Sequence, residues 1–388
     1  MFKRTRSGRR ELIDRKIRIN QPVIDEVEIE EVSEVLRTGM LTTWHGSGEK
    51  VSDFERMFAS YIGVEYAIAV NSGTAALHTA LAACGIGHGD EVIVPAMTFV
   101  ATANVVLIQG AKPVFVDVDP VTLCMDPEKF QNAITDNTKA VIPVHVYGCP
   151  AEMDAIMEIA EDKGIIVIED AAQAHGALYK GRKVGSIGHM GCFSFFASKN
   201  MTTGEGGMIT TNDAEYARKC RLFRTHGQEE AHMAVMPGLN YRMTEFEAAI
   251  GLVQLSKLDR LNDIRARNAE ILGSYLKGIS GVVTPTFPSY VKPSHYVYTI
   301  RVKSGPKKSR DALQKYLMEN GIETAVYWPT PVHLHPLYMG LYGYQRGLLP
   351  ISEEASDEVL SLPVHPKVST DELRYITEKI EEFFVSEL

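Results

Sequence analysis

Two charged side chains follow apolar runs, where burying a charge is energetically unfavourable. Lys199 comes after the aromatic run FSFFA and before the Gly-rich turn TTGEGG, and Asp170 ends the run GIIVIED. A buried lysine has a lowered pKa and can act as an amine nucleophile. A buried carboxylate is costly to desolvate unless it meets a cation or several donors. The alternatives are a structural lysine and an aspartate that caps the next helix.

Two further short stretches carry residue types that suit a ligand. Residues 72–74, Ser-Gly-Thr, follow the run YAIAV and open a helical pattern. Free backbone N–H groups at a helix N-terminus bind phosphate well, although the same residues also cap a helix that holds no ligand. Phe99 follows the run EVIVP, where a buried core aromatic is the alternative, and Gln173 lies about one turn after Asp170.

The elements that must position these residues are short strands. Apolar runs alternate with helical stretches up to about residue 215, which is typical of an α/β fold with a mainly parallel sheet covered by helices on both faces. Ligands bind outside the carboxyl ends of such strands, so we expect the four features to converge there. The last two runs are joined by a short Gly-rich connection, which predicts a close pair with one antiparallel strand. The seven runs are residues 66–70, 91–95, 112–118, 140–148, 164–170, 192–197 and 207–211.

These four features together meet the requirements of pyridoxal phosphate: a phosphate-binding turn, an aromatic ring that can stack on the cofactor, a buried acid and a buried amine. The acid keeps the pyridine nitrogen protonated so that the ring acts as an electron sink, and the amine forms a Schiff base. A dinucleotide dehydrogenase is the rival that the alternating pattern suggests. No G-x-G-x-x-G follows an early strand, and the GEGG turn after Lys199 lacks the strand-to-helix step.

Composition excludes several other classes. The formal net charge of −9 argues against a nucleic-acid-binding protein. The five cysteines include no C-x-x-C pair, so we expect reduced thiols in a cytoplasmic protein and no structural metal. No apolar run approaches the roughly 20 residues needed to cross a bilayer, so we expect no membrane span.

We expect two domains after a basic N-terminal arm. Residues 1–18 form the arm, with a mobile or surface-lying segment as the simplest interpretation and a transit peptide or an anion-binding arm as alternatives. Residues 19–250 form the large domain. Residues 251–388 form a connecting helix and a small C-terminal α+β domain, because the strand-like HYVYTIRV is followed by helical patterns.

Nearly the whole chain resembles the DegT-type sugar aminotransferases, which are pyridoxal-phosphate enzymes of fold type I, the aspartate aminotransferase fold. This resemblance implies a seven-stranded large domain, a small domain and a homodimer with shared active sites. The motifs that carry it are NSGTAALHTAL, PAMTFVATANVV, IEDAAQAHGA, SFFASKNMTTGEGGMITT, RTHG, GLNYRMTEFEAAIGLVQL and PVHLHPLY.

The resemblance implies a role for each matching residue. Lys199 is expected to hold the cofactor as a Schiff base and to shuttle the proton, and Asp170 to pair with the pyridine nitrogen. Gln173 is expected near the phenolic oxygen and Phe99 on the ring face. The phosphate is expected to meet four residues: Gly73, Thr74, Ser194 and, from a second subunit, Asn240.

The implied reaction moves an amino group from L-glutamate to a keto group of a nucleotide-linked deoxysugar. Relatives with histidine in place of the lysine dehydrate sugars, so Lys199 favours amino transfer over dehydration or a non-catalytic sensor of the same fold. Tyr327 and His333 resemble the segment that approaches the sugar, with packing between the domains as the alternative. Trp44 and His45 either tune substrate choice or cover the entrance.

Overall fold

The computed structural model describes residues 16–42, 48–230, 232–303, 305 and 308–385. Most of the basic arm and the Trp44–His45 pair lie outside the described residues. Within the described residues, no helix is both long enough and apolar enough to cross a membrane.

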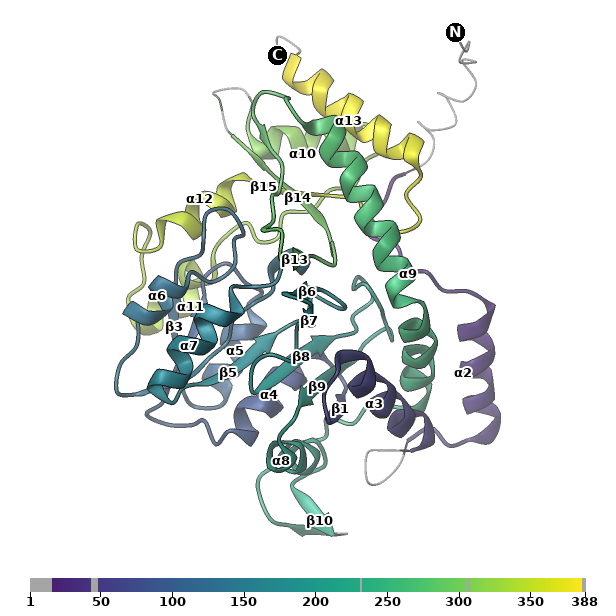
Figure 1. The fold of residues 1–388 in the computed structure, drawn as a ribbon, viewed down its shortest axis with the longest axis vertical. Coiled ribbons are helices and arrows are strands. Elements are labelled where there is room, and N and C mark those ends of the chain that lie inside the picture. The colour runs from purple at the N-terminus through teal and green to yellow at the C-terminus, as the bar shows by residue number, and fades with distance from the viewer. Residues whose placement is uncertain (1–15, 43–47, 231, 304, 306–307, 386–388) are drawn as a thin grey trace.

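The seven predicted strands form one sheet in the order β1-β9-β8-β5-β4-β2-β3. Figure 1 labels β1, β9, β8, β5 and β3 of this sheet. β9 pairs antiparallel with both β1 and β8, and the other neighbours are parallel. The mainly parallel sheet with one antiparallel strand is therefore confirmed. The strands are β1 (Tyr66–Val70), β2 (Glu91–Pro95), β3 (Lys112–Val116), β4 (Thr138–Val141), β5 (Ile166–Asp170), β8 (Met190–Ser194) and β9 (Gly207–Thr211).

One strand differs from its prediction. β8 ends at Ser194 rather than near residue 197, so Lys199 does not end a strand but lies in the turn that joins β8 to β9. The reason is that Phe195 and Phe196 already belong to the irregular turn, where Phe195 N–H donates to the carbonyl of Gly206.

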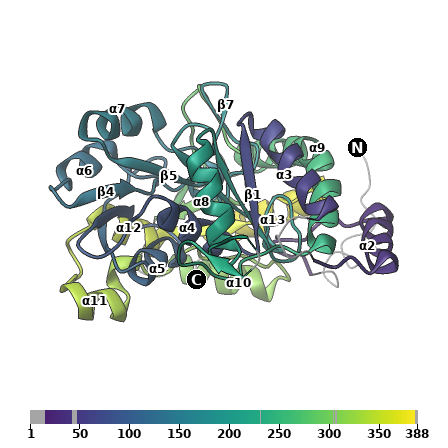
Figure 2. The same ribbon diagram turned by 90° about the horizontal axis from the view of Figure 1, so that it is seen from below.

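Helices cover both faces of the sheet (Figure 2). One face buries the even-numbered side chains of β1 and β5 against α4 (Gly73–Ala83), α5 (Ala101–Ile108) and α8 (Ala214–Arg224). The opposite face packs on α3 (Glu49–Ile62), α6 (Pro127–Asn132) and α7 (Met153–Lys163). Side chains alternate along a strand, so Asp170 shares the α4 side of the sheet with Ile168.

The helix α9 (Glu245–Leu276) contributes to two hydrophobic cores. Its N-terminal half packs Leu255 and Leu258 with α3, and its C-terminal half packs Leu272 and Leu276 with the C-terminal elements. Those elements are β12 (Val282–Val283), β14 (Tyr298–Val302), β15 (Val359–Leu362), α10 (Arg310–Glu319) and α13 (Thr370–Val385). The three strands form a separate antiparallel sheet.

The end of the predicted arm is not a free surface segment. Ile17 is buried in the C-terminal core and bridges to Ile322, because its backbone N–H and carbonyl pair with residues 321 and 323. The remaining elements are α2 (Glu26–Thr38), β6 (Leu178–Tyr179), β7 (Arg182–Lys183), β10 (Gln228–Glu230), β11 (Met233–Ala234), β13 (Val291–Lys292), α11 (Pro336–Tyr342) and α12 (Pro350–Glu358).

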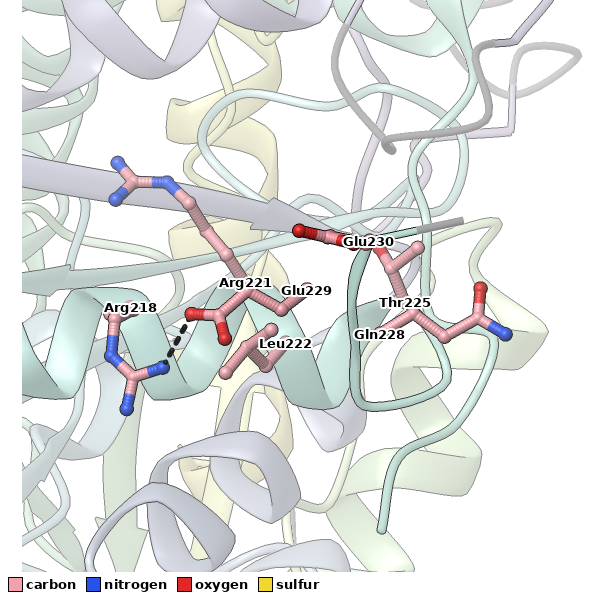
Figure 3. A pocket seen from close by; sticks show the side chains of 7 residues that line it. All are labelled: Arg218, Arg221, Leu222, Thr225, Gln228, Glu229 and Glu230. Carbon is pink, nitrogen blue, oxygen red and sulfur yellow. Dashed lines mark hydrogen bonds and ion pairs between the residues drawn. The ribbon is translucent and has the colours of Figure 1, made fainter. Parts of the chain in front are cut away.

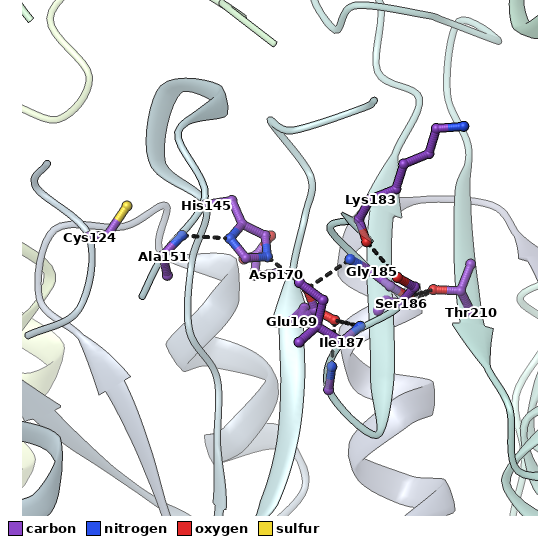
Figure 4. A network of polar contacts seen from close by, with 12 residues as sticks. Cys124, His145, Ala151, Glu169, Asp170, Lys183, Gly185, Ser186, Ile187 and Thr210 are labelled. Carbon is purple, nitrogen blue, oxygen red and sulfur yellow. Dashed lines mark hydrogen bonds and ion pairs between the residues drawn. The ribbon is translucent and has the colours of Figure 1, made fainter. Parts of the chain in front are cut away.

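A buried carboxylate anchors the loop between β7 and β8 (Figure 4). Glu169 accepts hydrogen bonds from the backbone N–H groups of Gly185, Ile187 and Gly188 at 2.7–2.8 Å, and lies 3.0 Å from Nε2 of His145. Burial by itself would raise the pKa of Glu169, but the His145 hydrogen bond and charge, with the backbone donors, lower it. The network fixes the strand that ends in Asp170.

We expect Glu169→Gln to lower the free energy of unfolding by about 3 kcal/mol, because a neutral amide no longer compensates the buried donors. Glu169 has a lowered pKa in the folded state, so its stabilisation is complete above the unfolded value of about 4.3 and is lost as pH falls. Urea titrations at several pH values should show the difference between wild type and variant shrinking in acid. The exposed Glu215→Gln is the control, and an equal loss in both variants would contradict the assignment.

Candidate active site

The turn after β1 lies against the end of β8. Ser72 caps α4 by accepting from Ala75 N–H at 3.1 Å, and a Cβ built on Gly73 would lie 2.6 Å from Cβ of Ser194. No acceptor among the described residues takes the N–H groups of Gly73 and Thr74, the first two of the helix. Residues 72–74 and Ser194, distant in sequence, therefore form one cradle with free donors.

Asp170 ends β5 and is 5% exposed. Its Oδ2 accepts from Thr102 Oγ1 at 2.8 Å, and its Oδ1 accepts from Ala172 N–H at 3.2 Å. Burial raises the pKa of Asp170, while the two hydrogen bonds and the positive charge of Lys199 act against that rise. The predicted acid and amine are thus within electrostatic range, and no direct ion pair joins them among the described contacts.

Lys199 is half-buried, whereas the sequence suggested a buried amine. Its Nζ lies 4.6 Å from the ring centroid of Tyr296, which is a cation–π contact. Tyr296 is buried, and its hydroxyl lies 2.8 Å from Oγ of Ser198. The turn that carries Lys199 is further held by Asn20, whose Nδ2 donates to the carbonyl of Ser198.

Phe99 and Gln173 each have part of the side chain available to a ligand. Phe99, in the segment between β2 and α5, is 56% exposed, so the buried-core alternative is wrong for this residue. Gln173 is buried, and its Oε1 accepts from Tyr147 N–H at 2.8 Å. Its Nε2 has no acceptor among the described residues, so it is available as a donor to a ligand.

Of three further predicted residues, one borders this cluster and two lie away from it. Asn240 is exposed and pairs through its backbone with Thr225. Tyr327 is half-buried, with its ring centroid 6.1 Å from that of Tyr296, and therefore borders the lysine turn. His333 is fully buried, and its Nε2 lies 3.2 Å from Oε1 of Glu353. This placement fits the packing alternative for His333, because burial leaves its side chain no open route to a sugar.

A pocket of about 220 Å³ lies elsewhere, between α8 and the segment that follows it (Figure 3). It contains none of the predicted site residues, and Arg218 at its wall pairs with Glu229. It is lined by Arg218, Arg221, Leu222, Thr225, Gln228, Glu229 and Glu230. This pocket is therefore separate from the lysine–aspartate site.

Sequence reasoning missed two neighbours of the key charges. Thr102 lies four residues after Thr98, a spacing that brings side chains together at the start of a helix, and this signal was available in the sequence. Tyr296 comes from the C-terminal unit, about 100 residues after Lys199, and no local pattern indicates that contact.

Comparison with known proteins gives consistent matches. A pleiotropic regulatory protein of Geobacillus stearothermophilus is 44% identical over 358 residues, which cover 91% of this chain and 94% of that protein. A GDP-perosamine synthase of Caulobacter vibrioides is 41% identical over 377 residues, covering 95% and 99%. The crystal structure of S. venezuelae DesV in complex with a ketimine intermediate matches with a TM-score of 0.88 and 36% identity, covering 92% of this chain and 94% of that one.

The fold and these matches define a pyridoxal-phosphate-dependent aminotransferase. The model of the DegT/DnrJ/EryC1/StrS aminotransferase family matches residues 22–381, and the chain belongs to that family. The residues present fit the cofactor on structural grounds. The cradle at Gly73 has free N–H donors. The aromatic ring of Phe99 is exposed, and the amide nitrogen of Gln173 has no acceptor among the described residues.

We expect Gly73→Ala to weaken binding of pyridoxal phosphate by roughly tenfold or more, because the new Cβ pushes Ser194 out of the cradle and removes phosphate donors. Binding of pyridoxal, which lacks the phosphate, should change much less. Fluorescence titration of both ligands measures this. Gly87→Ala is the matched control, since a Cβ there meets nothing within 4 Å. Equal weakening of both ligands would show that the turn does not serve the phosphate.

Proposed function

We propose that this protein is a cytoplasmic aminotransferase that moves an amino group from L-glutamate to a keto group of a nucleotide-linked deoxysugar. The observation that carries the proposal is the convergence of Lys199, Asp170 and the Gly73–Ser194 cradle at the carboxyl edge of one sheet. The named activity of the GDP-perosamine synthase relative supports the acceptor class. The five free thiols, four of them buried, support a reducing compartment.

Each residue of the site has a definite task in this proposal. The N–H groups of Gly73 and Thr74 and the hydroxyl of Ser194 bind the phosphate, and Phe99 covers one ring face. Asp170 holds the proton on the pyridine nitrogen, and Gln173 donates to the phenolic oxygen. When bound, pyridoxal phosphate supplies an electron sink for the carbon that loses its proton.

Lys199 has two tasks. Its Nζ would hold the cofactor, and its free amine would act as the general base and acid that moves the substrate proton. The ring of Tyr296 lies 4.6 Å from Nζ and would stabilise the ammonium that forms once this amine has accepted the proton. Tyr327, next to Tyr296, borders the space where the acceptor would enter.

Two competing functions predict different outcomes. Dehydration of a similar sugar uses the same cofactor but leaves no donor nitrogen in the product. A non-catalytic sensor has some support in the name of the regulatory relative, yet it requires no lysine in this position. The presence of Lys199 together with Asp170 favours transfer.

We expect nitrogen from ¹⁵N-labelled L-glutamate to appear in one keto nucleotide-sugar of a panel, as measured by mass spectrometry. Lys199→Ala should keep the folded structure but lose both the yellow colour of lysine-bound cofactor and the label transfer. Lys315→Ala, an exposed lysine on α10, is the matched control and should transfer normally. An unlabelled, dehydrated product would establish the alternative reaction, and label transfer by the Lys199 variant would disprove the role of that amine.

We also propose a homodimer whose active sites are shared, with the large unit at residues 19–250 and the small unit at residues 251–388 as the two parts of each subunit. Apolar side chains stand exposed on α2, at Val27 and Leu36, and on the segment after α8, at Met233 and Val235. Exposed apolar patches on a soluble protein indicate a partner surface. Asn240 ends that segment and is exposed, so it is available to a neighbouring subunit.

Mixing two inactive variants tests this sharing. If Asn240 serves the neighbouring site, subunits with Lys199→Ala and subunits with Asn240→Ala should regain activity after unfolding and refolding together. Random pairing gives half hybrids, each with one intact site of two, so the mixture should reach roughly a quarter of the wild-type rate. A mixture as inactive as the separate variants would show that Asn240 acts within its own subunit.

A further inference from the structure

Two buried threonines form a hydrogen-bonded chain that ends at the carboxylate of Asp170. Thr98 and Thr102 are 1% and 0% exposed, and their Oγ1 atoms are 2.8 Å apart. Oγ1 of Thr102 is also 2.8 Å from Oδ2 of Asp170. Both threonines lie in the short segment between β2 and the first turn of α5, which also carries Phe99.

The direction of this chain follows from counting hydrogens. An ionised carboxylate only accepts, and each threonine hydroxyl has one hydrogen to donate. Thr102 must therefore donate to Asp170, which leaves Thr98 to donate to Thr102. Successive donors polarise one another, so the bond that reaches the carboxylate is strengthened. A protonated acid would not require this order.

The other groups around the carboxylate are few. The positive charge of Lys199, from the turn after β8, and His145, after β4, favour the ionised form. The thiol of Cys192 on β8 is also close, and Asp170 contributes to raising the pKa of that thiol. Ala172 N–H is the other donor to the carboxylate. Thr102 is thus the one side-chain hydroxyl among the described residues that bonds to Asp170.

We infer that Thr102, oriented by Thr98, is a positioning residue that keeps Asp170 ionised and aimed at the cofactor's ring nitrogen. The inference rests on the proposed function, since it gives Asp170 its partner. Phe99 and Thr102 lie in one segment, so the same turn would position both the aromatic ring that covers the cofactor and the hydroxyl that orients Asp170. The threonines touch neither substrate nor reacting atoms.

Binding of two ligands to four proteins tests the inference. The ligands are pyridoxal phosphate and an analogue with C–H in place of the ring nitrogen, and the proteins are wild type, Thr102→Val, Thr102→Ser and Thr79→Val. Thr79 is an equally buried helix threonine whose hydroxyl has no partner in the described structure, so it controls for the loss of a buried hydroxyl.

Thr102→Val should bind pyridoxal phosphate roughly tenfold to a hundredfold more weakly, because a hydrogen bond to a charged group is lost. Its affinity for the analogue should stay within about twofold, since the analogue has no nitrogen for Asp170 to hold. Thr102→Ser should restore the preference for the true cofactor, and Thr79→Val should match wild type. Equal weakening of both ligands by Thr102→Val would overturn the inference, because a merely structural role predicts that result.

A second measurement uses the protein without cofactor. The ¹³C carboxyl resonance of Asp170, assigned by its loss in Asp170→Asn, should titrate about one to two pH units higher in Thr102→Val than in wild type. An unchanged titration would overturn the inference whatever the cofactor does. Failure of wild type to bind pyridoxal phosphate would instead overturn the proposed function, so the two failures are distinguishable.

Discussion

The burial of one carboxylate sets the requirements for the rest of the site. Asp170 is 5% exposed at the end of an apolar strand, and a charge in that place is unfavourable unless donors and cations surround it. Thr102, Ala172 N–H and the charge of Lys199 all stabilise the ionised form. Even so, burial raises the pKa of Asp170 above its ordinary value. A cationic ring nitrogen would complete its surroundings.

The fold brings these groups together through the parallel sheet. Because β1, β2, β5 and β8 run in the same direction, the segments that follow them meet at one edge, although the first and last are more than 120 residues apart in sequence. The neighbouring residue Glu169 points to the other face of the sheet and fixes β5 through His145 and the loop at residues 185–188 (Figure 4). Two adjacent acids on one strand thus have different functions, since alternation sends one to a structural network and the other to the site.

The sequence was sufficient for the sheet because each strand is a short apolar run followed by a turn signal. Strand direction also placed the turn at residues 72–74 and Asp170 at one edge of the sheet, whereas Ser194 was expected beside Gly73 only from the family resemblance. The errors of the sequence-based prediction came from non-local packing. Lys199 lies beyond the end of β8, and Ile17 joins the C-terminal core instead of a free arm. Buried His333 contacts Glu353, 20 residues later, and no periodicity indicates that contact.

The separation of the amine from the acid is as informative as their proximity. Opposite charges in a partly buried site gain most when they touch, yet Lys199 Nζ rests on the ring of Tyr296 rather than on Asp170. A direct ion pair would satisfy both groups and leave no reason for a ligand to bind between them. In the observed arrangement Lys199 contacts the ring of Tyr296 and Asp170 contacts the hydroxyl of Thr102. Both charged groups would therefore remain available to a cofactor bound between them. Tyr296 and Thr102 are therefore the contacts that the two charged groups make in place of a direct ion pair.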